Sequence, residues 1–80
     1  MILYFKINNM EREKTKIKDL VECINKVYAE RNLPGDMTVD FGAYCNIYTY
    51  LPEVHYLKTA FKSMNYKECR IWLEWYLEAL

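Results

Sequence analysis

The sequence predicts an α+β fold, in which two helices cover one face of a single antiparallel sheet. Three observations carry this prediction. Residues 12–31 have the apolar period of a helix, alternating apolar residues flank Gly42–Ala43, and short apolar runs stand near both ends of the chain. The chain has 80 residues, a length that we expect to form one domain, 1–80.

The first two predicted elements are a strand and a helix. Residues Ile2–Ile7 are apolar, β-branched and aromatic apart from one lysine, and the run ends at two asparagines, as is typical of a strand. Residues 12–31 predict a helix because their apolar residues form one stripe. This stripe comprises Ile17, Leu20, Val21, Ile24, Val27 and Tyr28. Asn32 and Pro34 predict its end, since asparagine tolerates the left-handed conformation and proline cannot continue a helix.

A hairpin and a second helix are predicted next. Residues 37–41 and 44–51 both alternate between apolar and polar side chains, and Gly42–Ala43 between them has the glycine-first pattern of a two-residue hairpin turn. Pro52 suits the first turn of a helix. The apolar stripe of that second helix would be Val54, Leu57, Phe61 and Met64.

The tail fits two structures. As a strand, residues 66–76 would turn Cys69, Ile71, Leu73 and Trp75 to one side; as a helix, residues 67–80 would form a stripe of Cys69, Leu73, Tyr76, Leu77 and Leu80. The strand is the favoured interpretation. The element order is then β-α-β-β-α-β, the split-βαβ arrangement of ferredoxin-like folds. The alternative is an α+β domain with a third, C-terminal helix over 67–80.

In the ferredoxin-like arrangement the face of the sheet without helices would be rich in aromatic side chains. Tyrosine, tryptophan and arginine dominate binding hot spots, so this face is the predicted partner-binding surface. Its residues are Tyr4, Tyr44, Tyr48, Tyr50, Arg70, Trp72 and Tyr76. The alternative is that these aromatic residues cover and stabilise the sheet through cross-strand pairs.

An aromatic open sheet also suggests single-stranded nucleic acid as a ligand. The segments LYFKIN (Leu3–Asn8) and FGAY (Phe41–Tyr44) loosely resemble the first- and third-strand motifs of the RNA-recognition motif, whose aromatic residues stack on bases. The resemblance implies nucleic-acid binding on the sheet. Asp40 stands where the third-strand motif has a basic residue, and eleven basic residues balance eleven acidic ones, which weakens the case for a phosphate ligand.

Catalytic and metal-binding patterns are not found in the sequence. Cys23, Cys45 and Cys69 are too widely spaced to start a zinc site, and we expect them to be reduced thiols. His55 is predicted on the solvent side of its helix. No phosphate-binding or nucleophile motif is found, so neither an enzyme nor a cofactor is predicted. No apolar run reaches the roughly 20 residues that cross a bilayer, so we expect a cytoplasmic protein without a membrane partner.

The sequence therefore predicts a small non-enzymatic module that binds a protein partner, or a second copy of itself as a homodimer, and acts by occlusion. Lys, Asn, Tyr and Ile, which have AT-rich codons, supply 28 of the 80 residues. This composition suggests an AT-rich genome such as that of a phage or mobile element. The narrower hypothesis is thus an inhibitor of a host enzyme or defence system.

Overall fold

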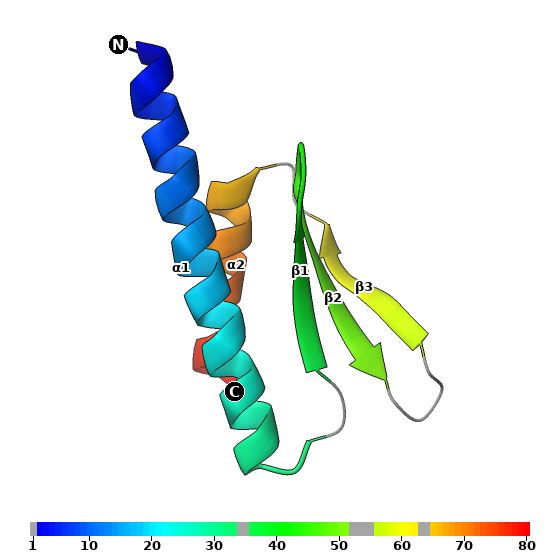
Figure 1. The fold of residues 1–80 in the computed structure, drawn as a ribbon. Helices are drawn as coiled ribbons and strands as arrows, with labels where there is room; N and C mark the ends of the chain where they lie inside the picture. The colour runs from blue at the N-terminus through cyan, green and yellow to red at the C-terminus, as the bar shows by residue number, and fades with distance from the viewer. Residues whose placement is uncertain (1, 34–35, 52–55, 63–64) are drawn as a thin grey trace.

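A computed structural model of the chain describes residues 2–33, 36–51, 56–62 and 65–80 (Figure 1). These residues form two helices and one antiparallel sheet with the strand order β1-β2-β3. The elements, in chain order, are α1 (Ile2–Glu30), β1 (Asp36–Phe41), β2 (Cys45–Leu51), β3 (Tyr56–Lys62) and α2 (Tyr66–Ala79). Both helices lie on the same side of the sheet. The structure is therefore a small α+β fold.

The core lies where α1, α2 and the first two strands meet. The helices run in the same direction, and α2 packs along the C-terminal half of α1 (Figure 1). The described residues of the core are Ile17, Val21, Ile24, Tyr28, Met37, Cys45, Ile47, Tyr66, Cys69 and Leu73. Full burial of one large aliphatic side chain stabilises a fold by about 1.5–3 kcal/mol, so this cluster supplies most of the driving force for packing.

Helix α1 confirms the predicted helix over 12–31 and extends it to the N-terminus. Residues Ile2–Ile7, predicted as a strand, are its first turns. Neither Gly nor Pro occurs before Pro34, so nothing in the sequence interrupts the helix upstream of residue 12. The C-terminal end lies where it was predicted: Asn32 has a φ of 55°, and the Leu33 amide donates to the Tyr28 carbonyl at 2.9 Å.

The tail is helix α2, so the favoured strand prediction is wrong and the alternative of a C-terminal helix is confirmed. Helical spacing buries Tyr66, Cys69 and Leu73 on one side, whereas a strand would have placed Ile71 and Trp75 on the buried side as well. The Asn65 side chain caps the helix by accepting from the Glu68 amide at 2.8 Å.

The pairing of the two hairpin strands is confirmed, but three residues, 42–44, connect them in place of the predicted two-residue turn, and the second predicted helix is wrong. Strands β1 and β2 pair around the predicted turn, with Phe41 opposite Cys45. Tyr56–Lys62 forms β3 on the other edge of β2, with Tyr56 opposite Leu51. Pairing along β2 satisfies backbone groups that a helix would have left open on that edge. The predicted helix start, Pro52–His55, lies outside the described residues.

The observed order is α-β-β-β-α, so the ferredoxin-like order is not confirmed. What remains of that prediction is its layering, with helices on one side of an antiparallel sheet. The first strand and the last strand of the predicted order are both helical. The predicted aromatic binding face depended on those two strands, so the positions of its residues have to be determined from the structure.

The Asn25 side chain joins α1 to β1. The Asn25 amide nitrogen donates to the Met37 carbonyl at 2.9 Å, and its oxygen accepts from the Met37 amide at 2.8 Å. This pair of bonds matches what a neighbouring strand would offer to β1. Asn25 therefore fixes the position of β1 along the axis of α1.

We expect Asn25→Ala to lower the free energy of unfolding by about 1–3 kcal/mol, because the Met37 carbonyl loses the Asn25 amide and the Met37 amide keeps only its bond to the Asp36 carboxylate. Urea denaturation followed by circular dichroism measures this change. Lys26→Ala, at the exposed neighbouring position, is the matched control and should change stability by less than about 0.5 kcal/mol. Equal stability of the two variants would contradict this role of Asn25.

Candidate functional site

The structure separates the seven residues predicted to form one binding face. Tyr4 lies in α1, Tyr48 and Tyr50 lie in β2, and Tyr44 precedes β2. Arg70, Trp72 and Tyr76 lie in α2. The predicted aromatic sheet face is therefore wrong as an arrangement, because four of its seven residues lie in helices and not in the outer strands.

Two of the α2 residues in this set face α1. Tyr76 and Tyr28 share a hydrogen bond between their hydroxyl groups. Arg70 donates from Nε to Glu13 at 2.5 Å and from a terminal nitrogen to Glu74 at 2.8 Å, and only 17% of its side chain is exposed. The Tyr28–Tyr76 and Glu13–Arg70 contacts hold the two helices together, whereas the Arg70–Glu74 pair lies within α2. Arg70 and Tyr76 are therefore already engaged within the fold.

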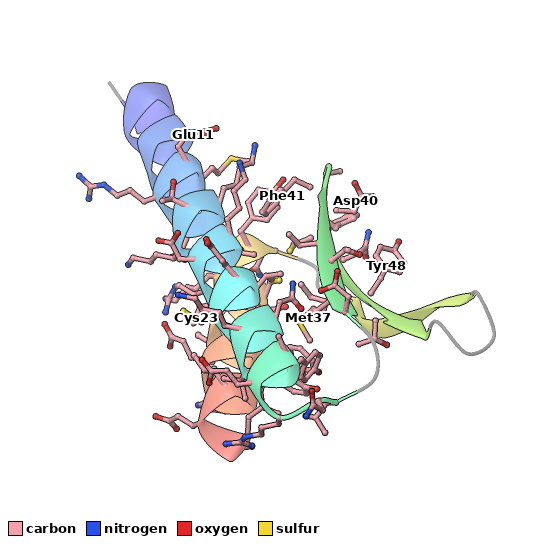
Figure 2. All side chains as sticks on the ribbon, turned by 60° about the horizontal axis from the view of Figure 1, so that its bottom comes forward. Glu11, Cys23, Met37, Asp40, Phe41 and Tyr48 are labelled. Carbon is pink, nitrogen blue, oxygen red and sulfur yellow. The ribbon has the colours of Figure 1, made fainter. Side chains whose placement is uncertain are left out.

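The side of the sheet away from the helices is mainly polar. Figure 2 shows Met37 and Phe41 on the α1 side of β1, while Asp40 and Tyr48 lie on the opposite side. Thr38 and Asp40 are exposed there, and Asp40 lies opposite Asn46 in the ladder. Tyr48 is half-buried. Among the residues whose side chains are described, this side of the sheet offers one aromatic residue and no aromatic cluster.

The outer face of α2 carries the apolar surface that the sheet lacks. Trp75 is 69% exposed, the largest exposure among the large apolar side chains described. One turn earlier, Ile71 and Trp72 are half-buried, and these three residues with Glu68 line a hollow of about 290 Å³. The Trp72 ring stacks on Tyr76, with centroids 5.2 Å apart and planes 19° apart. One tryptophan is thus supported from within the fold and the other projects from it.

Acidic side chains surround this face. Glu68, Glu74 and Glu78 are all exposed on α2, and Lys67 is the exposed cation of the same helix. We use the name outer α2 face for Ile71, Trp72 and Trp75 with the hollow between them. The border of this face is therefore net negative.

Sequence reasoning retained Trp72 but missed Trp75 and Ile71. In the strand interpretation these two residues point toward the core. In the helical alternative Trp75 follows Ile71 by four residues and Trp72 by three. Ile71 and Trp75 then lie on the side opposite Leu73, so the helical period alone places them outside. The missed signal was therefore in the sequence.

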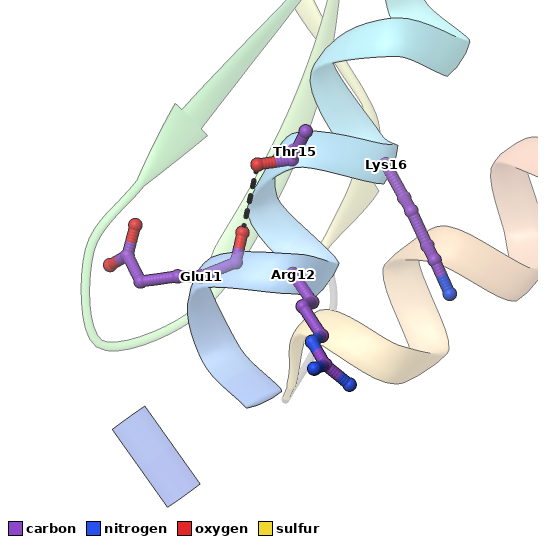
Figure 3. A pocket seen from close by; sticks show the side chains of 4 residues that line it. All are labelled: Glu11, Arg12, Thr15 and Lys16. Atoms are coloured by element: carbon purple, nitrogen blue, oxygen red, sulfur yellow. Dashed lines mark hydrogen bonds between the residues drawn. The ribbon is translucent and has the colours of Figure 1, made fainter. Parts of the chain in front are cut away.

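A second hollow, of about 430 Å³, lies on α1 beside Glu11, Arg12, Thr15 and Lys16 (Figure 3). The Thr15 hydroxyl donates to the Glu11 carbonyl at 3.0 Å, and Lys14 pairs with the Glu11 carboxylate at 3.6 Å. The four lining residues are exposed and come from two adjacent turns of α1. They form an ordinary solvated helix surface.

Among the described residues no group of three or more His, Cys, Asp or Glu side chains could hold a metal ion. His55 lies outside them. No described helix is long and apolar enough to cross a membrane. No protein-family model, curated protein or solved structure matches the chain. The outer α2 face therefore has to be interpreted from its own chemistry.

The two tryptophans should differ in their response to a soluble quencher. In Trp72→Phe only Trp75 emits, and we expect redder emission and a larger acrylamide quenching constant than in Trp75→Phe, where only Trp72 emits. The reason is the exposure of Trp75 and the stacking of Trp72 on Tyr76. Stern–Volmer titration of both variants measures the difference, and equal constants would contradict the assignment.

The Tyr28–Tyr76 contact predicts a loss of stability in alkali. Burial, with the hydrogen bond to Tyr76, raises the pKa of Tyr28 above its ordinary value of 10.0. A raised pKa means that the contribution of Tyr28 is complete below pH 10 and is lost as the pH rises above 10. Urea denaturation at pH 9 and above pH 10 should show a steeper fall for the native chain than for Tyr28→Phe. Tyr44→Phe, at an exposed position, is the control and should follow the native chain.

Proposed function

We propose that the chain is a non-enzymatic protein-binding module that docks its partner on the outer α2 face. The observation that carries this proposal is the exposure of Trp75 beside a hollow lined by Ile71 and Trp72. A tryptophan buries a large area at low entropic cost and is the residue most typical of binding hot spots. Exposing it to water is otherwise unfavourable for so small a fold.

The size of the hollow favours a protein side chain as its occupant. Pockets for small ligands and cofactors hold about 300–1000 Å³ and enclose most of the ligand. The hollow on α2 is about 290 Å³ and lies on the outside of one helix. It suits an apolar side chain projecting from a partner surface. Trp75 would then close over that side chain from one end of the hollow.

The acidic border defines the rest of the partner. Glu68 and Glu78 would attract Lys or Arg side chains around the partner's apolar group, whereas Glu74 is already paired with Arg70. The same carboxylates disfavour the phosphates of a nucleic acid. Four of the seven residues of the predicted aromatic face lie in helices, so the arrangement that suggested base stacking is not confirmed and gives nucleic-acid binding no support. The inhibitor of a host enzyme or defence system remains the narrower form of this proposal, acting by occlusion.

A differential capture experiment tests the proposed function. The native chain and the variants Trp75→Ala and Leu33→Ala are immobilised on a support and incubated with nuclease-treated extract of the source cells. The bound proteins are then quantified by mass spectrometry. We expect at least one protein retained by the native chain and by Leu33→Ala to fall about tenfold or more with Trp75→Ala, as for a hot-spot residue worth above roughly 1.4 kcal/mol. Leu33 is the matched control because it is 41% exposed and does not line the hollow on the outer α2 face.

Two outcomes would contradict the proposal. Equal recovery of every protein by Trp75→Ala and the native chain would remove the outer α2 face as the docking surface. Light scattering that shows a dimer of the native chain and a monomer of Trp75→Ala would replace the foreign partner by a second copy of the chain. Circular dichroism of each variant establishes that α2 remains folded.

A further inference from the structure

Two buried cysteines meet where β2 joins the helical layer. Cys45 is the first residue of β2 and Cys69 lies in the first turns of α2, and neither side chain is exposed. Their Sγ atoms are 2.6 Å apart and share a hydrogen bond. Both are free thiols in the structure, as is the exposed Cys23. The spacing of 24 residues gave no sign of this pairing, since the elements that join the two cysteines were predicted differently.

The surroundings hold this pair in place from both sides. Phe41 lies opposite Cys45 in the ladder, and its ring meets Tyr66 edge to face at 5.7 Å. The Tyr66 hydroxyl donates to the Gly42 carbonyl in the hairpin turn. The ammonium group of Lys14 lies 5.6 Å from the Tyr66 ring, which adds a cation–π contact from α1. The first turn of α2 is thus fixed to the hairpin independently of the sulfur atoms.

We propose that Cys45 and Cys69 form a reversible intrachain disulfide, so that the junction of β2 and α2 is a site of oxidative cross-linking. A disulfide needs two Sγ atoms about 2.05 Å apart on a compatible backbone. The present separation requires only a small approach of two side chains. This inference rests on the geometry of the pair and does not depend on the proposed binding function.

The chemistry balances with a peroxide as the oxidant. The Cys45 thiolate attacks one oxygen of hydrogen peroxide, the O–O bond breaks, and Cys45 becomes a sulfenic acid while the departing hydroxide takes a proton to leave as water. The Cys69 sulfur then attacks the Cys45 sulfur. The S–S bond forms, the S–O bond breaks, and the hydroxide leaves as a second water with the Cys69 proton. Two thiols are oxidised by two electrons and one peroxide is reduced to two waters.

The asymmetry of the pair supports this order of events. The hydrogen bond with Cys69 lowers the pKa of Cys45, and the same bond together with burial raises the pKa of Cys69. Cys45 is therefore the sulfur that reaches the thiolate first, and Cys69 is the one positioned to resolve it. Because neither thiol is exposed, the oxidant has to enter through a local opening, and the reaction should be slower than that of a surface thiol.

Accessibility and oxidation are measured on the full chain. In the native state a bulky disulfide reagent such as dithionitrobenzoate should label Cys23 alone, and all three thiols after unfolding in denaturant. Treatment of the Cys23→Ser chain with hydrogen peroxide should then lower its mass by about 2 Da without forming a dimer. Non-reducing peptide mapping should recover one peptide pair that joins Cys45 to Cys69. A phosphine reductant should restore the original mass.

Thermal melting of the Cys23→Ser chain gives an independent readout. The oxidised form should melt at a higher temperature than the reduced form, because the cross-link limits the unfolded chain over the segment between residues 45 and 69. Recovery of Cys45 as a sulfinic acid with Cys69 still a thiol would overturn the proposal. Disulfide-linked dimers as the main product would overturn it as well.

Discussion

The packing of α2 against α1 and β2 is the constraint on which the rest of the structure depends. Leu73 and Cys69 have no exposed surface, and they meet the stripe of α1 on one side and the buried residues of β1 and β2 on the other. A chain of 80 residues buries only a little over about 60% of its unfolded surface, so the loss of this contact would remove a large share of the buried surface that stabilises the fold. The helical state of the tail is therefore required by the core.

The same constraint decides what the molecule shows to solvent. When Leu73 points inward, residues two positions before and after it, Ile71 and Trp75, have to point outward along the helix. The position of the outer α2 face thus follows from the position of the core. Arg70 and Tyr76 stand between these two sides and bond to Glu13 and Tyr28 of α1. They fix the rotation of α2 about its axis, and with it the direction in which Trp75 projects.

The elements whose sequences carry both a period and a stop signal could be predicted. The alternation before and after Gly42–Ala43 gave the hairpin, and Asn32 marked the end of α1 correctly because its left-handed conformation is a local property. Residues 66–80 have a period that fits a strand or a helix, and tertiary packing decided for the helix. Residues 2–7 continue α1 because neither Gly nor Pro interrupts the chain upstream of residue 12. At Tyr56–Lys62 the open edge of β2 outweighed the apolar helical spacing.

The candidate site depended on the state of the tail more than on any single residue. Trp72 belongs to the predicted set and to the outer α2 face, whereas Trp75 enters only when the tail is helical. The contact of Cys45 with Cys69 was likewise out of reach, since it requires the register of β2 and the phase of α2 together. Local sequence signals specify neither quantity. Both follow from which side chains the small core can bury.

The proposed cross-link and the proposed binding face lie on different sides of α2, which makes their effects separable. Cys69 lies on the buried side of α2 near its start, and Trp75 lies on the exposed side nearly two turns later. A disulfide at Cys69 would hold the start of α2 against β2 without entering the hollow beside Trp75. Oxidation would then act on binding only through the stability of α2, by lowering the population of chains in which the helix has come away from the sheet. The apparent affinity of a partner that docks on the folded helix can then rise only in proportion to the increase in the fraction of chains with α2 in place.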